Sequence, residues 1–152
     1  MISSCIYAFF ASLGFGIIFN IRGKKLYFAA LGGSIGWFIY SLSLKAIPPL
    51  YALTLAALSF SVYSEIMARI LKSPITIFVI CALIPLVPGG GMYYTMLYIL
   101  QDNLSMAIET GIETISNAGS LVMGILIVSS IMKIVNNKKQ KINNNIEKST
   151  SE

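Results

Sequence analysis

Five stretches of mainly apolar residues, separated by short polar segments, occupy most of this chain and constrain its fold more than any other feature. A helix needs about 20 such residues to cross the hydrocarbon core of a bilayer. Because a transmembrane helix satisfies its backbone hydrogen bonds internally, the pattern predicts an all-α integral membrane protein with about five transmembrane helices. The predicted spans are residues 2–21, 26–44, 50–71, 75–100 and 114–135.

The composition excludes an ordinary soluble domain. Apolar residues make up 56% of the 152 residues and charged residues only 11%. One compact core could not bury so many apolar side chains, so they must face lipid or one another. The chain has no histidine, which removes the commonest general base and zinc ligand. We therefore expect neither catalysis nor a metal or other cofactor, and no nucleic-acid partner.

The basic residues predict how the helices are oriented in the plasma membrane. Of the eleven Lys and Arg residues, Lys45 lies on one side of the zigzag that five crossings produce, and the other ten lie opposite. Because Lys and Arg in short loops mark the cytoplasmic face, we place the N-terminus outside and the C-terminus inside. The polar segment 136–152 is predicted to be a disordered cytoplasmic tail that sets topology and contacts anionic membrane lipid.

The fourth stretch contains residues that break helical hydrogen bonding. Pro85 and Pro88 are followed directly by Gly89, Gly90 and Gly91. Counted from Ser73, Pro85 lies about 12 residues along the chain, or roughly 18 Å at 1.5 Å per residue, so the break is predicted near the midplane of the bilayer. Unwound backbone at that depth is tolerated only where protein buries it or a watery cavity receives it.

This break is the first candidate for substrate binding. The segment from Pro88 to Gly91 would let backbone approach a ligand, and a helix restarting near Met92 would present free N–H groups to a carboxylate. The alternative is a proline kink that only helps helices to pack.

Glu65 and Arg69 lie one turn apart in the third stretch, where they can form an ion pair. Burial of an ionisable group is costly, so Glu65 is a candidate to bind a proton or the amino group of a substrate. The alternative is an anchoring pair whose side chains extend to the interface.

Three further features have structural interpretations at least as strong as functional ones. Asn117, in the fifth stretch, could bond to a solute or to a neighbouring helix. Gly32, Gly33 and Gly36 favour close packing of the second helix over chemistry. Trp37 and the tyrosines at 93 and 94 are assigned no binding role, because aromatic residues in spans usually pack or mark an interface.

Several of these segments resemble the threonine/serine exporter family. Two short segments resemble parts of its membrane half: Gly14-Phe15-Gly16-Ile17-Ile18-Phe19-Asn20 in one span and Leu31-Gly32-Gly33-Ser34-Ile35-Gly36 in the next. A longer match runs from Ser64-Glu65 through Ala68-Arg69 and Lys72-Ser73-Pro74 to Ile84-Pro85-Leu86-Val87-Pro88-Gly89-Gly90-Gly91, and on through Tyr93 to Met96. The resemblance covers roughly residues 10–130 and is to the small five-helix subunit of the two-component form.

The resemblance implies export of a small-molecule substrate, threonine or serine, with proton coupling and with small dicarboxylates as the alternative cargo. It also implies a larger partner subunit with a soluble N-terminal region and about five transmembrane helices. Two five-helix units of opposite topology would enclose a midplane site. There the segment from Pro88 to Gly91 would bind the substrate carboxylate, Glu65 a proton or the ammonium group, and Asn117 would complete the site. A non-transporting accessory or scaffold subunit is the remaining alternative.

Overall fold

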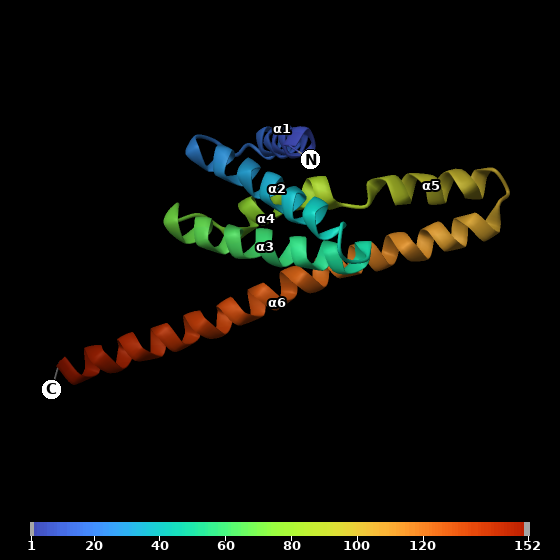
Figure 1. Cartoon of the computed structure of the whole chain (residues 1–152). Coiled ribbons are helices and arrows are strands. Elements are labelled where there is room, and N and C mark those ends of the chain that lie inside the picture. The colour runs from blue at the N-terminus through green and yellow to red at the C-terminus, as the bar shows by residue number, and fades with distance from the viewer. Residues whose placement is uncertain (1, 151–152) are drawn as a thin grey trace.

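The computed structural model describes the backbone of residues 2–150, and the side chains of residues 2–135 and Lys138. All regular structure in the described range is helical, so the predicted all-α class is confirmed (Figure 1). The elements are α1 (Ile2–Ile18), α2 (Lys24–Ser43), α3 (Pro49–Ile70), α4 (Ile75–Leu83), the short 3-10 helix η1 (Ile84–Leu86), α5 (Gly89–Leu100) and α6 (Leu104–Thr150).

Three helices of the described chain are long and apolar enough to cross a membrane: α2, α3 and the Leu104–Val135 part of α6. The bent pair formed by Ile75–Leu86 and α5 makes a fourth if it crosses as one broken span. The chain is therefore a multi-pass membrane protein. The apolar helix α1 is shorter, at 17 residues, so the count of five spans stays a prediction.

Short connections with defined ends link successive helices. Pro49 occupies the first turn of α3, where its missing N–H costs no helical hydrogen bond. Asn20, Lys72 and Asp102 follow α1, α3 and α5 with φ values of 57°, 45° and 56°. In each case the next residue donates its N–H to a carbonyl five residues back, which is the left-handed closure common at helix C-termini.

Glycines bring α2 close to three other helices. A Cβ at Gly33 would collide with the Ser12 hydroxyl of α1, and a Cβ at Gly36 would lie 3.1 Å from Leu86 and 3.2 Å from Phe60. The close packing predicted from the small residues of the second stretch is therefore confirmed. Near these contacts lies a core cluster of seven buried residues: Leu53, Ala56, Ala57, Phe60, Ala82, Leu86 and Leu121.

Two hydrogen bonds tie α2 to its neighbours. The Tyr63 hydroxyl of α3 donates to the Phe28 carbonyl oxygen at 2.9 Å, and the Ser34 hydroxyl donates to the Cys5 carbonyl oxygen of α1 at 3.1 Å. In an apolar surrounding these bonds add to van der Waals packing as a source of helix association. Helices α1 to α4 therefore form one packed unit.

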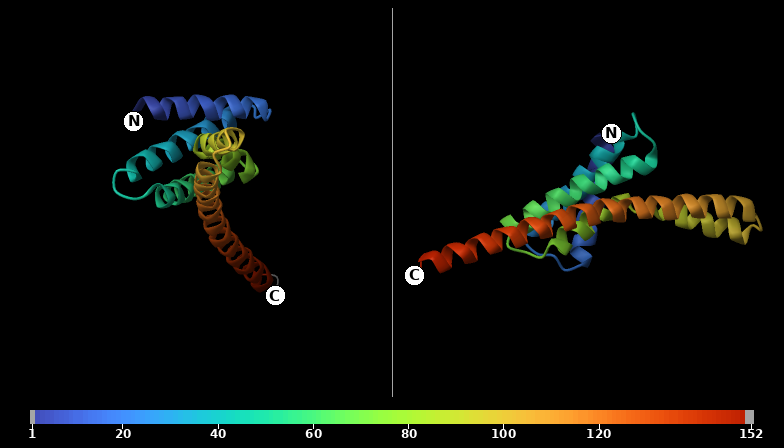
Figure 2. Two further views of the ribbon diagram at one scale, coloured as in Figure 1. Left: turned by 90° about the vertical axis from the view of Figure 1, so that its right-hand side faces the viewer. Right: turned by 90° about the horizontal axis from the view of Figure 1, so that it is seen from below.

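Helix α5 and the start of α6 form a hairpin that stands apart from this unit. No residue of α5 is buried, and its packing partner is α6. Figures 1 and 2 show the hairpin extending beyond the packed α1–α4 helices, while the following part of α6 lies along α3. The hairpin therefore joins the unit through the α4–α5 break and through α6.

The α1–α2 and α3–α4 connections lie at the same end of the packed unit, and the α2–α3 connection with Lys45 lies at the other (Figure 1). Arg22, Lys24, Lys25 and Lys72 therefore gather at one end, as the zigzag requires. Which end faces the cytoplasm stays a prediction.

The backbone of residues 136–150 continues α6 as a helix, which differs from the disorder expected for segment 136–152. A helix that is already formed extends without a new nucleation cost, so polar residues of moderate propensity can prolong it. Residues 151–152 lie outside the described residues.

Gly124 of α6 provides a test of the α3–α6 contact. A Cβ at this position would lie 2.5 Å from the Ala57 Cβ and 3.0 Å from the Thr54 carbonyl oxygen, and backbone cannot give way easily. We expect Gly124→Ala to destabilise the protein by about 1–3 kcal/mol in thermal unfolding in detergent. Gly119→Ala is the matched control, because a Cβ there meets nothing within 4 Å. Equal stability of the two variants would contradict the contact.

Candidate functional site

The helix begun by α4 is interrupted between Leu83 and Gly89. Residues 84–86 form η1, Val87 is extended, and Pro88 precedes α5 with φ −76° and ψ 55°. The two helical parts meet at 50°. Pro85 and Pro88 cannot donate backbone hydrogen bonds, so the helical ladder cannot pass through this segment. The depth of the break in a bilayer stays a prediction.

Helix α5 begins at Gly89, three residues before the restart predicted near Met92. Met92 donates to the Pro88 carbonyl oxygen at 3.3 Å, and Gly89 donates to Val87 at 2.7 Å. The N–H groups of Gly90 and Gly91 therefore belong to the first turn of a helix, where no intrahelical acceptor exists. They lie at the positive end of the α5 dipole.

The three glycines have different surroundings. Gly89 and Gly90 are exposed, and a Cβ at either would meet nothing within 4 Å. Gly91 lies against Thr114 of α6 so closely that a Cβ would collide with the Thr114 hydroxyl. Gly91 thus has a packing role, whereas Gly89 and Gly90 leave open space beside free N–H groups.

Asn117 lies on α6 one turn after Thr114, so the structure brings it to the same region as the glycines. Its side chain is partly exposed. Among the predicted site residues, the segment from Pro88 to Gly91 and Asn117 therefore form one group.

Glu65 and Arg69 form a separate group on α3. The Arg69 Nη2 and Glu65 Oε2 atoms are 3.6 Å apart, and the side chains are 43% and 15% exposed. Ser61, one turn deeper on the same face, is 1% exposed, and its hydroxyl has no hydrogen-bond partner among the described residues. A polar stripe therefore runs along α3 from a buried hydroxyl through a largely buried carboxylate to an exposed guanidinium.

These two groups do not meet within the chain. Helices α3 and α6 run in the same direction, with Gly124 packed on Ala57 (Figure 1). Glu65 lies eight residues beyond Ala57 and Asn117 seven residues before Gly124, so they are about 22 Å apart along the axes at 1.5 Å per residue. Thr114, with Gly91 against it, is further still from Glu65.

Trp37, to which the sequence assigns no binding role, lines a cavity of about 350 Å³ beside the break. Pro85 of η1 forms another part of its wall, and α1 supplies the rest through Ser4, Tyr7, Ala8 and Ala11. The Trp37 Nε1 atom is buried and has no hydrogen-bond partner in the described part of the chain. Nothing in the sequence indicates this cavity, because it depends on how α1 crosses η1.

The described side chains include no group of three His, Cys, Asp or Glu residues that could hold a metal ion. The family model described as "Threonine/Serine exporter, ThrE" matches residues 4–131, which is most of the chain. Searches of curated proteins and of solved structures found no match.

Proposed function

The chain belongs to the threonine/serine exporter family, and on this premise we propose that it is the small membrane subunit of a secondary exporter of threonine and serine. The observation that carries the proposal is the broken helix α4–η1–α5, in which the free N–H groups of Gly90 and Gly91 lie next to the open space beside Gly89 and Gly90. Interrupted helices of this kind hold the substrates of many secondary transporters. The family is described as an exporter, which favours transport over catalysis.

The substrate carboxylate binds at the start of α5 in this proposal. The N–H groups of Gly90 and Gly91 and the positive end of the helix dipole attract an anion. Asn117, one turn from Thr114 on α6, would add a side-chain hydrogen bond. The Trp37 indole, which can only donate, lines a cavity on the other side of the break and is a second candidate donor to the substrate.

Glu65 carries the coupling proton in this scheme. The carboxyl and amino groups of one amino acid are only a few ångströms apart, whereas Glu65 and Asn117 are separated by about 22 Å along the helices. This distance favours proton binding by Glu65 over binding of the ammonium group of the same substrate molecule. The buried Ser61 hydroxyl one turn away supports a polar route inward from Arg69.

The proposed exporter has five spans in this subunit, with α1 as the first and the bent α4–η1–α5 segment as the fourth. The N-terminus lies outside and the C-terminus in the cytoplasm, since ten of eleven basic residues then lie inside. A larger subunit of opposite topology covers the outward face of the α5–α6 hairpin. The support for this partner is that α5 has no buried residue. Three of its large apolar side chains, those of Met92, Tyr93 and Met96, are each more than 60% exposed.

Two alternatives follow from the same geometry. Free N–H groups recognise any carboxylate, so small dicarboxylates such as succinate fit the same site. The close packing of the α2 glycines favours the second alternative, a non-transporting scaffold. In such a scaffold Glu65 and Arg69 would only stabilise assembly.

Transport by a two-subunit exporter predicts that cells need both chains for export. Cells loaded with a threonine- or serine-containing dipeptide should release labelled amino acid when this chain and the larger subunit are expressed together. Either chain alone should leave efflux at background, because each supplies half of the enclosed site. Release of dicarboxylate but not amino acid would support the alternative cargo, and no release of either would contradict transport.

Gly90→Leu tests the binding of substrate at the start of α5. The side chain would enter the open space beside the N–H groups without meeting protein atoms near its Cβ, so the fold should persist. Hydrogen bonds to a charged group contribute about 1.5–3 kcal/mol each, so we expect export to fall at least about tenfold. Gly119→Leu, at an equally open position on α6, should export normally. Normal export by Gly90→Leu would contradict substrate binding at the start of α5, but it would not affect the family membership.

Glu65→Gln separates proton coupling from assembly. The amide has about the size of the carboxyl group, but it cannot bind and release a proton at ordinary pH. We expect export driven by a proton gradient to be lost while this chain still co-purifies with the larger subunit. Joint loss of export and co-purification would instead support the scaffold interpretation, in which the 3.6 Å pair with Arg69 holds the assembly.

A further inference from the structure

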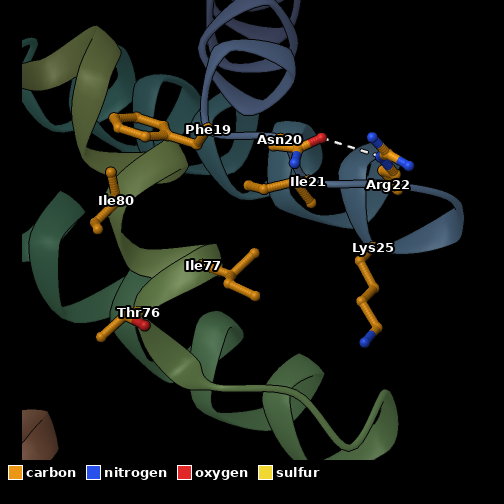
Figure 3. Close-up of a pocket in the computed structure, with 8 residues that line it drawn as sticks. All are labelled: Phe19, Asn20, Ile21, Arg22, Lys25, Thr76, Ile77 and Ile80. Atoms are coloured by element: carbon orange, nitrogen blue, oxygen red, sulfur yellow. Dashed lines mark hydrogen bonds between the residues drawn. The ribbon is translucent and has the colours of Figure 1, made fainter.

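A cavity of about 630 Å³ lies at the end of the packed unit where the α1–α2 connection meets α4. Figure 3 shows its two kinds of wall. Phe19, Ile77 and Ile80 lie on one side, and Arg22 and Lys25 lie on the other. The cavity thus combines an apolar surface with two cations at the end of the helices.

The cationic wall is organised by local structure. Asn20 has left-handed backbone, with φ 57°, and its Oδ1 atom accepts a hydrogen bond of 3.0 Å from Arg22 Nε. The guanidinium of Arg22 makes no other hydrogen bond among the described residues, so its remaining N–H groups can donate to an anion. Within the described side chains, neither Arg22 nor Lys25 has a carboxylate within 4.0 Å.

The start of α2 adds to the same positive potential. Helices prefer acidic residues in the first turn, where the dipole is positive. The first turn of α2 instead contains Lys24 and Lys25, has no acidic residue, and has no side-chain cap at Gly23. These like charges cost stability unless an anion lies nearby. This feature is independent of the cavity and points to the same chemistry.

The apolar wall distinguishes a lipid from a free anion. Ile77 and Ile80 follow one another along one face of α4, directed from the charged end toward the middle of the helix. Phe19 and Ile80 are 51% and 42% exposed. An inorganic anion would use only Arg22 and Lys25, whereas an acyl chain would cover this strip while its phosphate meets the cations.

We propose that this cavity is a binding site for one anionic phospholipid, with the phosphate at Arg22 and Lys25 and an acyl chain along Phe19, Ile77 and Ile80. Basic pockets between transmembrane helices commonly bind anionic head groups. The lipid would hold the α1–α2 connection against α4 and offset the charge at the start of α2. This site lies on α4 away from the break at residues 84–88, so it does not depend on the transport proposal.

The test is lipid retention by the purified full-length chain in neutral detergent, measured by native mass spectrometry with phosphatidylglycerol or phosphatidylcholine. We expect phosphatidylglycerol to be retained and phosphatidylcholine not. A basic residue near a membrane surface contributes about fivefold in affinity, so Arg22→Gln and Lys25→Gln should each weaken retention by about that factor. Lys24→Gln is the comparison variant: Lys24 adds to the potential at the start of α2 but does not line the cavity, so its loss should weaken retention by less.

Ile80→Ser tests the acyl-chain wall, because Ile80 is exposed and lies outside the buried clusters. It should weaken phosphatidylglycerol retention while circular dichroism shows an unchanged fold. Glycerol phosphate should not displace the lipid at equal concentration. Three results would each overturn the proposal: equal loss with Lys24→Gln, which indicates diffuse attraction; displacement by glycerol phosphate, which indicates a free-anion site; or no effect of Ile80→Ser.

Discussion

Every backbone N–H and C=O group in the hydrocarbon region must find a partner inside the protein, and the rest of this structure depends on that constraint. Continuous helices meet it without help. The segment from Ile84 to Pro88 does not, so other helices must cover it. Leu86 is buried between Gly36 and Phe60, and Pro85 lies against Gly33. The packed unit thus shields η1, while Gly89 and Gly90 on the α5 side stay exposed. Backbone left uncovered at such a break is suited to a polar solute.

Glycine positions determine where this shielding is possible. Gly33 and Gly36 let α2 approach α1, α3 and η1, and Gly124 lets α6 lie on α3. In each case a methyl group would meet backbone or a buried side chain. Gly90 and Gly119 have no such neighbour among the described residues. The same residue type therefore serves packing at some positions and leaves space at others, and only the surroundings distinguish them.

The sequence predicted those features that depend on local chemistry. The all-α class, the packing role of Gly32 to Gly36 and the Glu65–Arg69 pair follow from composition and spacing. Features that depend on how helices cross did not follow. The cavity at Trp37 requires α1 beside η1, and the separation of Glu65 from Asn117 requires the register of α3 on α6. The start of α5 at Gly89 was missed because glycine disfavours helix, a preference that the free first turn outweighs here.

The separation of Glu65 from the glycines also limits the mechanism. In the proposed exporter, a proton at Glu65 and a substrate at the start of α5 would be at least about 22 Å apart along the helices, which is too far for exchange by direct contact. In the proposed exporter, coupling would then require that each ligand favours one of two arrangements of the protein, because a ligand shifts an equilibrium only by its difference in affinity for the two states. The hairpin of α5 and α6 joins the packed α1–α4 unit at Val87 and Pro88, where the helical ladder is interrupted, and also through α6, which continues along α3. A rotation of the hairpin would break few hydrogen bonds at Val87 and Pro88, but it would also have to bend α6 or move it along α3, against the contact of Gly124 with Ala57.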